Sequence, residues 1–351
     1  MMIKPSPSVN FYQYPNIYIE RETAIGKRLV IVAEADKGDF YDPTLIYSKD
    51  MAADFFGGGQ LVQAYEDATT FQEGLSIYLM RIEPMMYEDA FSVLEALTFD
   101  LLYIDGVHYD KHKEIILMFI ELAKIKEEKG NLIHGITTLS SAYKTYASLI
   151  KLRKSIADLA IDSGDDFIER GKYLSIVVDQ AEFKNAGAVY AGMLATLDPE
   201  VSPVNKTIPA TKLTVEYTKD QILDLRSMGI VCFKNTFKKG VTCTSSSCAV
   251  STEGSVHKHI SNFRIAQSLI NQVALELQPL IGKTNIPYQI LNAEDILNGV
   301  CDEFVGLSRI RDYNYNIVPD TLNGAIDVEI EFVPVFSVHS MSTHTRVRVF
   351  K

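Results

Sequence analysis

Three polar side chains that could act as acids, bases or metal ligands follow one apolar stretch of the sequence. Asp105, His108 and Asp110 stand in "YIDGVHYD", directly after the apolar residues of "FDLLYIDG". If that stretch is a buried strand, these side chains reach the carboxyl edge of a sheet, where α/β enzymes bind their ligands. The sequence has no G-x-S-x-G turn and no H-x-x-E-H pair to accompany them. A structural interpretation therefore competes with catalysis. In the structural interpretation, Asp110 caps the next helix and Gly106 forms the turn.

A second group could bind zinc. Cys243, Cys248, His257 and His259 supply four possible ligands within a short segment. The spacing between the cysteines is at the edge of the structural-zinc range, and His-x-His departs from the usual H-x3–5-H. We expect unpaired, reduced thiols rather than a metal site or a disulfide between subunits, because sparse cysteines are typical of a cytoplasmic product.

The run "DFFGGGQL" at 54–61 has the look of a phosphate-binding loop. Such a loop needs a strand before the glycines and a Lys-Ser/Thr after them. Here a helical pattern precedes Gly57, and Gln60 and Leu61 stand where Lys-Ser/Thr belongs. The sequence predicts helix, glycine turn and helix, with no bound cofactor.

The composition excludes several classes of partner. The chain has 351 residues, 47% of them hydrophobic and 23% charged, with a net charge of −11. An acidic chain has no general attraction for nucleic acid or for anionic membranes. No apolar run is long enough to span a bilayer, and the N-terminus lacks the apolar block of a secretory signal. We expect no nucleic-acid partner, no membrane insertion and assembly in the cytoplasm.

Apolar strands and amphipathic helices alternate between residues 25 and 200. This pattern predicts a mainly parallel sheet covered on both faces, an α/β layer domain. The predicted strands are 28–35, 75–82, 99–106, 131–138 and 173–180, and the predicted helices are 48–56, 60–71, 87–97, 110–129, 141–160 and 185–197.

The regular alternation of strands and helices ends after residue 200, and we expect a smaller α+β domain over 201–341. It would contain helices at 220–229, 259–281 and 292–307 and strands at 230–237 and 324–338. Two further strand patterns stand alone at the ends of the chain, in an N-terminal arm (1–24) and a C-terminal arm (342–351). A strand without a neighbour must pair with something distant, including another chain.

The order of these pieces resembles the tail sheath proteins of contractile phage tails and of headless injection particles such as R-type bacteriocins. The resemblance is carried by "PNIYIERET", "RLVIVAEADKGDFYDPTLIYSKDMAADFFGGGQLVQAYEDATTFQEGLSIYLMRI", "AGAVYAGMLATLDPEVSPVNKTI", "DLRSMGIVCFKN", "SNFRIAQSLINQVALELQPLIGKTN" and "GAIDVEIEFVPVFSVHSM". The family's glycine-tryptophan turn before the long helix is replaced by "KKGVTCTSSSCAVSTEGSV", and the chain has no tryptophan.

This resemblance implies a structural protein and no enzyme. It implies a homopolymer wound helically around an inner tail tube, in contact with baseplate and tail terminator proteins, that contracts to drive the tube through a cell envelope. The protein would belong to a virion or a similar particle. The terminal strands would form the subunit interface, with Asn16, Ile17, Tyr18, Ile19, Glu20 and Arg21 in one arm and Arg346, Val347, Arg348, Val349 and Phe350 in the other.

The resemblance also implies that a helix of the C-terminal domain lies against the inner tube through complementary charge, and either the helix at 260–278 or the last predicted helix is the candidate. The last predicted helix carries an acidic group. It consists of Glu294, Asp295, Asp302 and Glu303, which stand one or two helical turns apart. An ordinary solvent-exposed face explains the same residues. Two other functions stay open at this level: an α/β enzyme or ligand-binding protein with a site near Asp105 and His108, and another structural component of a phage tail or baseplate.

Overall fold

The computed structural model describes residues 25–162, 168–182, 184–209, 212–250, 255–283, 286–320 and 325–335. Both predicted terminal arms, with all eleven of their candidate interface residues, lie outside the described residues.

A seven-stranded sheet of order β2-β3-β1-β4-β5-β8-β9 forms the centre of the larger unit. Only β2 runs antiparallel to its neighbour among these pairings, so the predicted mainly parallel sheet is confirmed. The strands are β1 (Leu29–Ala33), β2 (Thr44–Ile46), β3 (Ile77–Arg81), β4 (Leu101–His108), β5 (His134–Thr138), β8 (Leu174–Val177) and β9 (Ile230–Val231).

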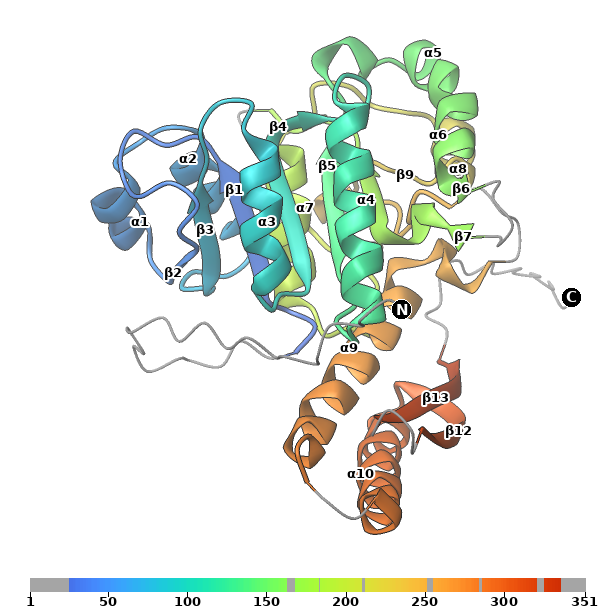
Figure 1. Ribbon diagram of the computed structural model, residues 1–351. Helices are drawn as coiled ribbons and strands as arrows, with labels where there is room; N and C mark the ends of the chain where they lie inside the picture. Colours follow the sequence, from blue (N-terminus) through green and yellow to red (C-terminus); the bar gives the residue numbers. More distant parts are fainter. Residues whose placement is uncertain are drawn as a thin grey trace, which may run out of the picture.

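Helices cover both faces of this sheet (Figure 1), as its apolar strands require. α3 and α4 lie on one face and α7 on the other, while α5, α6 and α8 lie toward the β9 flank. The helices are α1 (Lys49–Phe56), α2 (Gln60–Ala68), α3 (Tyr87–Ala96), α4 (Lys113–Glu128), α5 (Tyr146–Leu149), α6 (Arg153–Ala160), α7 (Ala186–Thr196) and α8 (Lys219–Ser227). The single helix predicted over 141–160 is wrong, because Thr145 caps a new helix and 3-10 turns interrupt the segment.

The predicted division at residue 200 does not separate the two units. β9 lies beyond that point in the sequence, yet it pairs in parallel with β8 and completes the sheet. The predicted strand 230–237 is split into β9 and β10 (Phe233–Thr236), and β10 forms a hairpin with β11 (Gly240–Cys243). β6 (Ile161–Asp162) and β7 (Ile168–Glu169) form another short pair.

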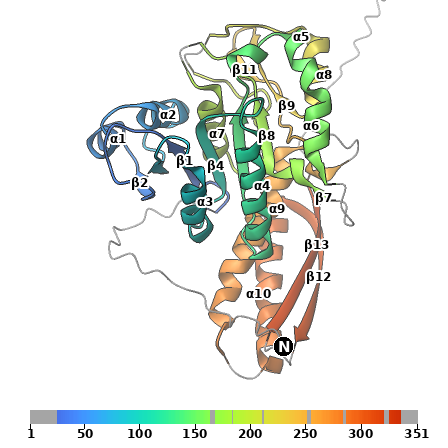
Figure 2. The same ribbon diagram turned by 45° about the horizontal axis from the view of Figure 1, so that its top comes forward.

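A smaller C-terminal module extends from the sheet domain (Figure 2). It consists of α10 (Ile286–Gly306), β12 (Ile310–Asp320) and β13 (Ala325–Pro334), packed against one side of α9 (Ile260–Leu277). Ile265, Leu269 and Val273 of α9 join Leu297 and Phe304 of α10 in a separate apolar core. Ile260 and Phe263 of α9 belong to the apolar core of the sheet domain instead, so this helix joins the two units.

Candidate functional site

The carboxyl edge of β4 is the place where an enzyme site would lie, and Asp105 is used there in a structural network. Its Oδ1 lies 2.8 Å from the Tyr103 hydroxyl, and the Asn185 side-chain amide donates to the same oxygen. Asn185 caps α7, since its Oδ1 accepts from the backbone N–H groups of Gly187 and Ala188. Burial raises the pKa of the Asp105 carboxyl in spite of these hydrogen bonds. The carboxylate therefore positions the first turn of α7.

His108 and Asp110 point to other partners. His108 Nδ1 lies 3.0 Å from Thr138 Oγ1, and burial lowers the pKa of its imidazole. The Asp110 carboxylate accepts from the backbone N–H and the hydroxyl of Ser140 at 2.8 and 2.6 Å. The predicted capping of the next helix by Asp110 is wrong, because α4 begins at Lys113 with His112 at its N-cap. Each of these three side chains is thus engaged with a different neighbour.

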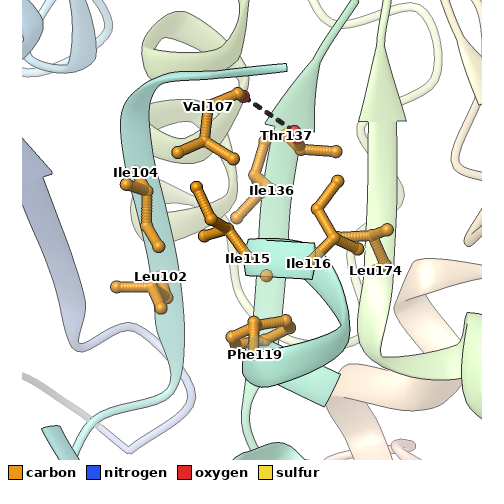
Figure 3. A pocket seen from close by; sticks show the side chains of 10 residues that line it. Leu102, Ile104, Val107, Ile115, Ile116, Phe119, Ile136, Thr137 and Leu174 are labelled. Atoms are coloured by element: carbon orange, nitrogen blue, oxygen red, sulfur yellow. Dashed lines mark hydrogen bonds between the residues drawn. The ribbon is translucent and has the colours of Figure 1, made fainter. Parts of the chain in front are cut away.

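A small apolar cavity lies between α4 and the sheet (Figure 3), on the inner side of that helix. Its volume is about 20 Å³, and its lining includes Leu102, Ile116, Phe119 and Ile136. The Thr137 hydroxyl on its wall donates to the Val107 carbonyl at 2.9 Å, so its hydrogen is not available to a ligand. A space of this size holds about one water molecule, which makes it a packing void and not a substrate pocket.

The glycine run lies between two helices, as predicted. α1 ends at Phe56 and α2 begins at Gln60, with Gly57 and Gly59 at φ 75° and 93° between them. Only glycine adopts these backbone conformations without strain. The run is a turn between helices and offers none of the context of a phosphate loop.

The cysteines are buried and free. Cys243 Sγ donates to the Ser245 carbonyl at 3.1 Å, and Cys232 Sγ lies 3.1 Å from Thr244 Oγ1. Cys248 is also fully buried, and burial raises the pKa of all three thiols, that of Cys232 to about 11 and that of Cys243 to about 12. Within the described part of the chain, no three Cys, His, Asp or Glu side chains gather as a metal site requires.

These thiols are expected to be unreactive in the native protein. Reagents such as DTNB attack the thiolate, which burial both hides and disfavours. At pH 8 the native chain should release well below about 0.3 equivalents of the coloured product in minutes, and the chain in guanidinium should release about four. Ser141→Cys, at an exposed position, serves as the positive control. Fast reaction of a native thiol would show that this segment opens.

The acidic residues of α10 do not all share one side of the helix. Successive residues turn by about 100°, so Asp295 and Asp302 fall on one exposed stripe, and Glu294 and Glu303 lie on opposite sides of it. Asp302 accepts a hydrogen bond from the Tyr313 hydroxyl at 2.8 Å, and this bond raises the pKa of Tyr313 to about 12. The candidate tube-facing surface is therefore narrower than the four residues suggest.

The β12–β13 hairpin is the most distinctive part of the C-terminal module. Its two strands pair antiparallel over almost their whole length, with Tyr315 opposite Ile330 and Asn316 opposite Glu329. Tyr313, Tyr315, Ile317, Val328, Ile330 and Phe332 pack toward the core of the module. Among the described residues, each strand pairs on one side only, so each outer edge presents unpaired N–H and C=O groups.

β12 is not among the predicted strands, although the sequence contains a signal for it. Residues 312–317 alternate Asp, Tyr, Asn, Tyr, Asn and Ile, which is the period of a strand with one buried face. The predicted strand at 324–338 coincides with β13 as far as the described residues allow. Without β12 there is no sheet in the C-terminal module to which terminal strands could add.

The fold is that of the sheath subunits of contractile tails and injection systems. The chain is similar to a sheath protein of an extracellular contractile injection system, the PVC sheath complex in its contracted state, with a TM-score of 0.73 and 12% identity over 95% of this chain and 97% of that one. It is similar to a sheath tail protein from Desulfitobacterium hafniense, with a TM-score of 0.65 and 10% identity over 93% and 97% of the two chains.

A third similar chain comes from the anti-feeding prophage baseplate, with a TM-score of 0.70 and 11% identity over 96% of this chain and 99% of that one. Comparison of the sequence with protein-family models and with curated proteins finds no match. In the described ranges, no helix combines the length and the apolar character needed to cross a bilayer.

Proposed function

We propose that this protein is the structural subunit of a contractile sheath, which polymerises helically around an inner tube and contracts to drive that tube through a target envelope. The similarity to sheath subunits extends over nearly the whole of both chains, including the C-terminal module. The single observation that carries the proposal is the β12–β13 hairpin, whose long outer edges are unpaired in the described part of the chain.

Strand addition explains why such a hairpin exists. An exposed edge is a hazard for a monomer, because its free backbone groups recruit other chains. In a polymer the same edge becomes the joint: strands at 16–21 and 346–350 of neighbouring subunits add to the hairpin through main-chain hydrogen bonds. Repeating this head-to-tail contact produces an open helix of stacked rings and not a closed dimer.

Contraction then follows from the division into two units. The extended state is kinetically trapped, and the contracted state is more stable. The hairpins and arms keep the subunits connected while the sheet domains swing outward, and no nucleotide is hydrolysed. The exposed stripe of α10 with Asp295 and Asp302 faces the tube, and baseplate and terminator proteins close the two ends of the sheath. The subunits assemble into the sheath in the host cytoplasm, and the sheath becomes part of the finished particle.

Removal of the N-terminal arm tests this proposal. Deletion of residues 1–22 is expected to leave a folded monomer with the far-UV spectrum of the full chain, because the described fold begins at residue 25. Electron microscopy should show tubes for the full chain and none for the deletion. Ile17→Pro/Ile19→Pro, which removes two main-chain donors, should act like the deletion, while Ile17→Val/Ile19→Val should still form tubes. Normal tubes from the deletion variant would overturn strand addition by this arm.

The baseplate chain of the anti-feeding prophage supports one alternative, a baseplate component with the same fold. That alternative predicts short closed rings in the microscope instead of long tubes. An enzyme gains no support from the β4 edge, since Asp105, His108 and Asp110 are engaged with separate structural partners.

A further inference from the structure

An exposed apolar surface lies on the two loops that follow β1 and β3, near the β2 flank of the sheet. Phe40, Met85 and Met86 are 40%, 73% and 47% exposed. The loops lie side by side, because the Tyr41 N–H donates to the Arg81 carbonyl at 2.9 Å and the Arg81 guanidinium lies 4.0 Å above the Phe40 ring. Three large apolar side chains on adjoining loops indicate a contact surface.

These loops and the first turn of α3 carry more exposed carboxylates than cations, and the exposed lysine among them is Lys37. We call the whole surface the acidic patch; its exposed carboxylates are Asp36, Asp39, Asp42, Glu83, Glu88 and Asp89. In the part of the chain that the structure describes, none of them forms an ion pair. Unpaired like charges on adjoining loops repel each other, so the acidic patch fits a partner surface that is apolar and basic.

Such a surface exists on the same molecule, at the β9 flank. Residues 130–157 contain no Asp or Glu but carry four cations. Lys151 and Lys154 are exposed and, among the described residues, form no ion pair. Ile150 and Leu223 add exposed apolar side chains at 39% and 51%. We call Ile150, Lys151, Lys154 and Leu223 the basic flank.

An ion pair and a hydrogen bond hold together the helices that carry the basic flank. Arg153, between the two lysines, binds Asp224 of α8 at 2.6 Å, and the Tyr146 hydroxyl donates to the same carboxylate at 2.8 Å. These bonds join α5 and α6 to α8 directly beside Leu223. The surface is therefore built from three helices that are fixed to one another.

The two surfaces cannot meet within one molecule. They lie at opposite flanks of the sheet in both views, with α1 and β2 at one flank and α5, α6 and α8 at the other (Figures 1 and 2). β3 and β8 are four strand spacings apart, or about 19 Å. The acidic patch follows the carboxyl ends of β1 and β3, and the segment that leads to α5 follows the carboxyl end of β5, so both surfaces lie at the same end of the parallel sheet.

We infer that the acidic patch of one copy binds the basic flank of a second copy of this chain, side by side at the level of the sheet domains. This contact deepens the proposed function, on which it rests, by naming a second joint besides strand addition. Different surfaces meet in it, so each copy keeps one surface of each kind free and the contact repeats around a ring or helix. Exposed apolar side chains contribute the burial, and the charges fix the partner and the register.

Charge reversal tests the contact. Asp39→Lys/Asp42→Lys/Glu83→Lys/Glu88→Lys leaves two of the six carboxylates beside four new lysines and so reverses the acidic patch, and Lys151→Glu/Lys154→Glu reverses the basic flank. Each variant alone is expected to lower the amount of sedimenting polymer by about tenfold or more, because its two surfaces then carry the same sign of charge and the contact between copies becomes repulsive. An equimolar mixture of the two should recover most of the polymer, since copies that alternate regain opposite charges at every contact. Glu73→Lys/Glu128→Lys, at exposed acids outside both surfaces, controls for added positive charge elsewhere and should assemble like the wild type.

Circular dichroism and thermal melting of the isolated variants establish that each is folded. Normal assembly by either variant alone, or no recovery in the mixture of the two folded proteins, would overturn the inference. Tubes that form regardless of charge would leave the proposed sheath function in place without this contact. Association that depends on the charges but yields no tubes would support the contact and remove the sheath function. A wild-type chain that does not associate at all would overturn both.

Discussion

Replacing Gly192 by alanine is expected to lower the free energy of unfolding by about 3 kcal/mol or more, a loss at the upper end for overpacking. A Cβ atom at this position would lie 1.8 Å from the Ala68 carbonyl oxygen and 2.5 Å from its carbon. Both belong to the backbone of α2, so no side chain can rotate to relieve the clash. α7 cannot move away either, because its residues 186–195 are buried on the sheet face opposite α4.

Urea unfolding followed by circular dichroism measures this loss, and the soluble yield should fall with it. Gly299→Ala is the matched control, since it is the same change on α10 with no atom within 4 Å of the added carbon. That variant is expected to gain about 0.5–1 kcal/mol, because alanine favours the helix. An unfolding midpoint for Gly192→Ala within error of the wild type would contradict the close approach of α2 and α7.

The parallel sheet was predictable from the sequence because its strands are buried on both faces. The predicted strands, such as those at 99–106 and 173–180, are continuous apolar runs. Amphipathic helices follow these strands in the sequence. β2 was not predictable in this way, since it has three residues and pairs antiparallel at the edge. β9 has only two residues, and its pairing with β8 spans more than fifty positions that no local pattern connects.

The candidate site was predictable in part. The alternation in β13 predicts a strand, whereas a sheet requires its partner β12. The alternation at 312–317 in β12 is a weaker signal, because the side chains that face the core there are mostly tyrosines between polar residues. The acidic patch was not predictable from the sequence, because its carboxylates come from separate segments around Asp39 and Glu83. Those segments become one surface only when β1 and β3 pair in parallel and bring their ends together.

The Asp100 carboxylate joins the base of the N-terminal arm to α9. It is fully buried and accepts from the backbone N–H groups of Gly26 and Arg28, both at 2.9 Å. The Arg28 guanidinium binds it at 2.8 and 2.7 Å, and the side-chain amide of Asn271 on α9 donates to it at 2.8 Å. Arg264, also fully buried on α9, donates to the Gly26 carbonyl at 3.0 Å. The segment that leads out of the described fold is thus tied to the helix that carries the β12–β13 hairpin.

Asp100→Asn is expected to lower the free energy of unfolding by about 3–5 kcal/mol, because the largely buried guanidinium of Arg28 loses its counter-ion. An amide also turns two donor hydrogens toward groups that are themselves donors. Urea unfolding measures the loss, and Glu95→Gln is the control. Glu95 pairs with Lys129 at 2.6 Å on the surface, with both side chains about half exposed, so the same acid-to-amide change there should cost less than about 1 kcal/mol.

Hydrogen exchange distinguishes a local role of Asp100 at the base of the arm from a general contribution to stability. If Asp100 holds the arm base locally, the amides of Gly26 and Arg28 should lose protection in Asp100→Asn by a larger factor than the amides of β5 or β8, which open only with the whole domain. Equal loss everywhere would mean that the carboxylate stabilises the fold without a special role at the arm. A selective loss would mean that Asp100 holds residues 25–28 against α9, the helix that also packs against the module to which the neighbouring arms add in the proposed sheath.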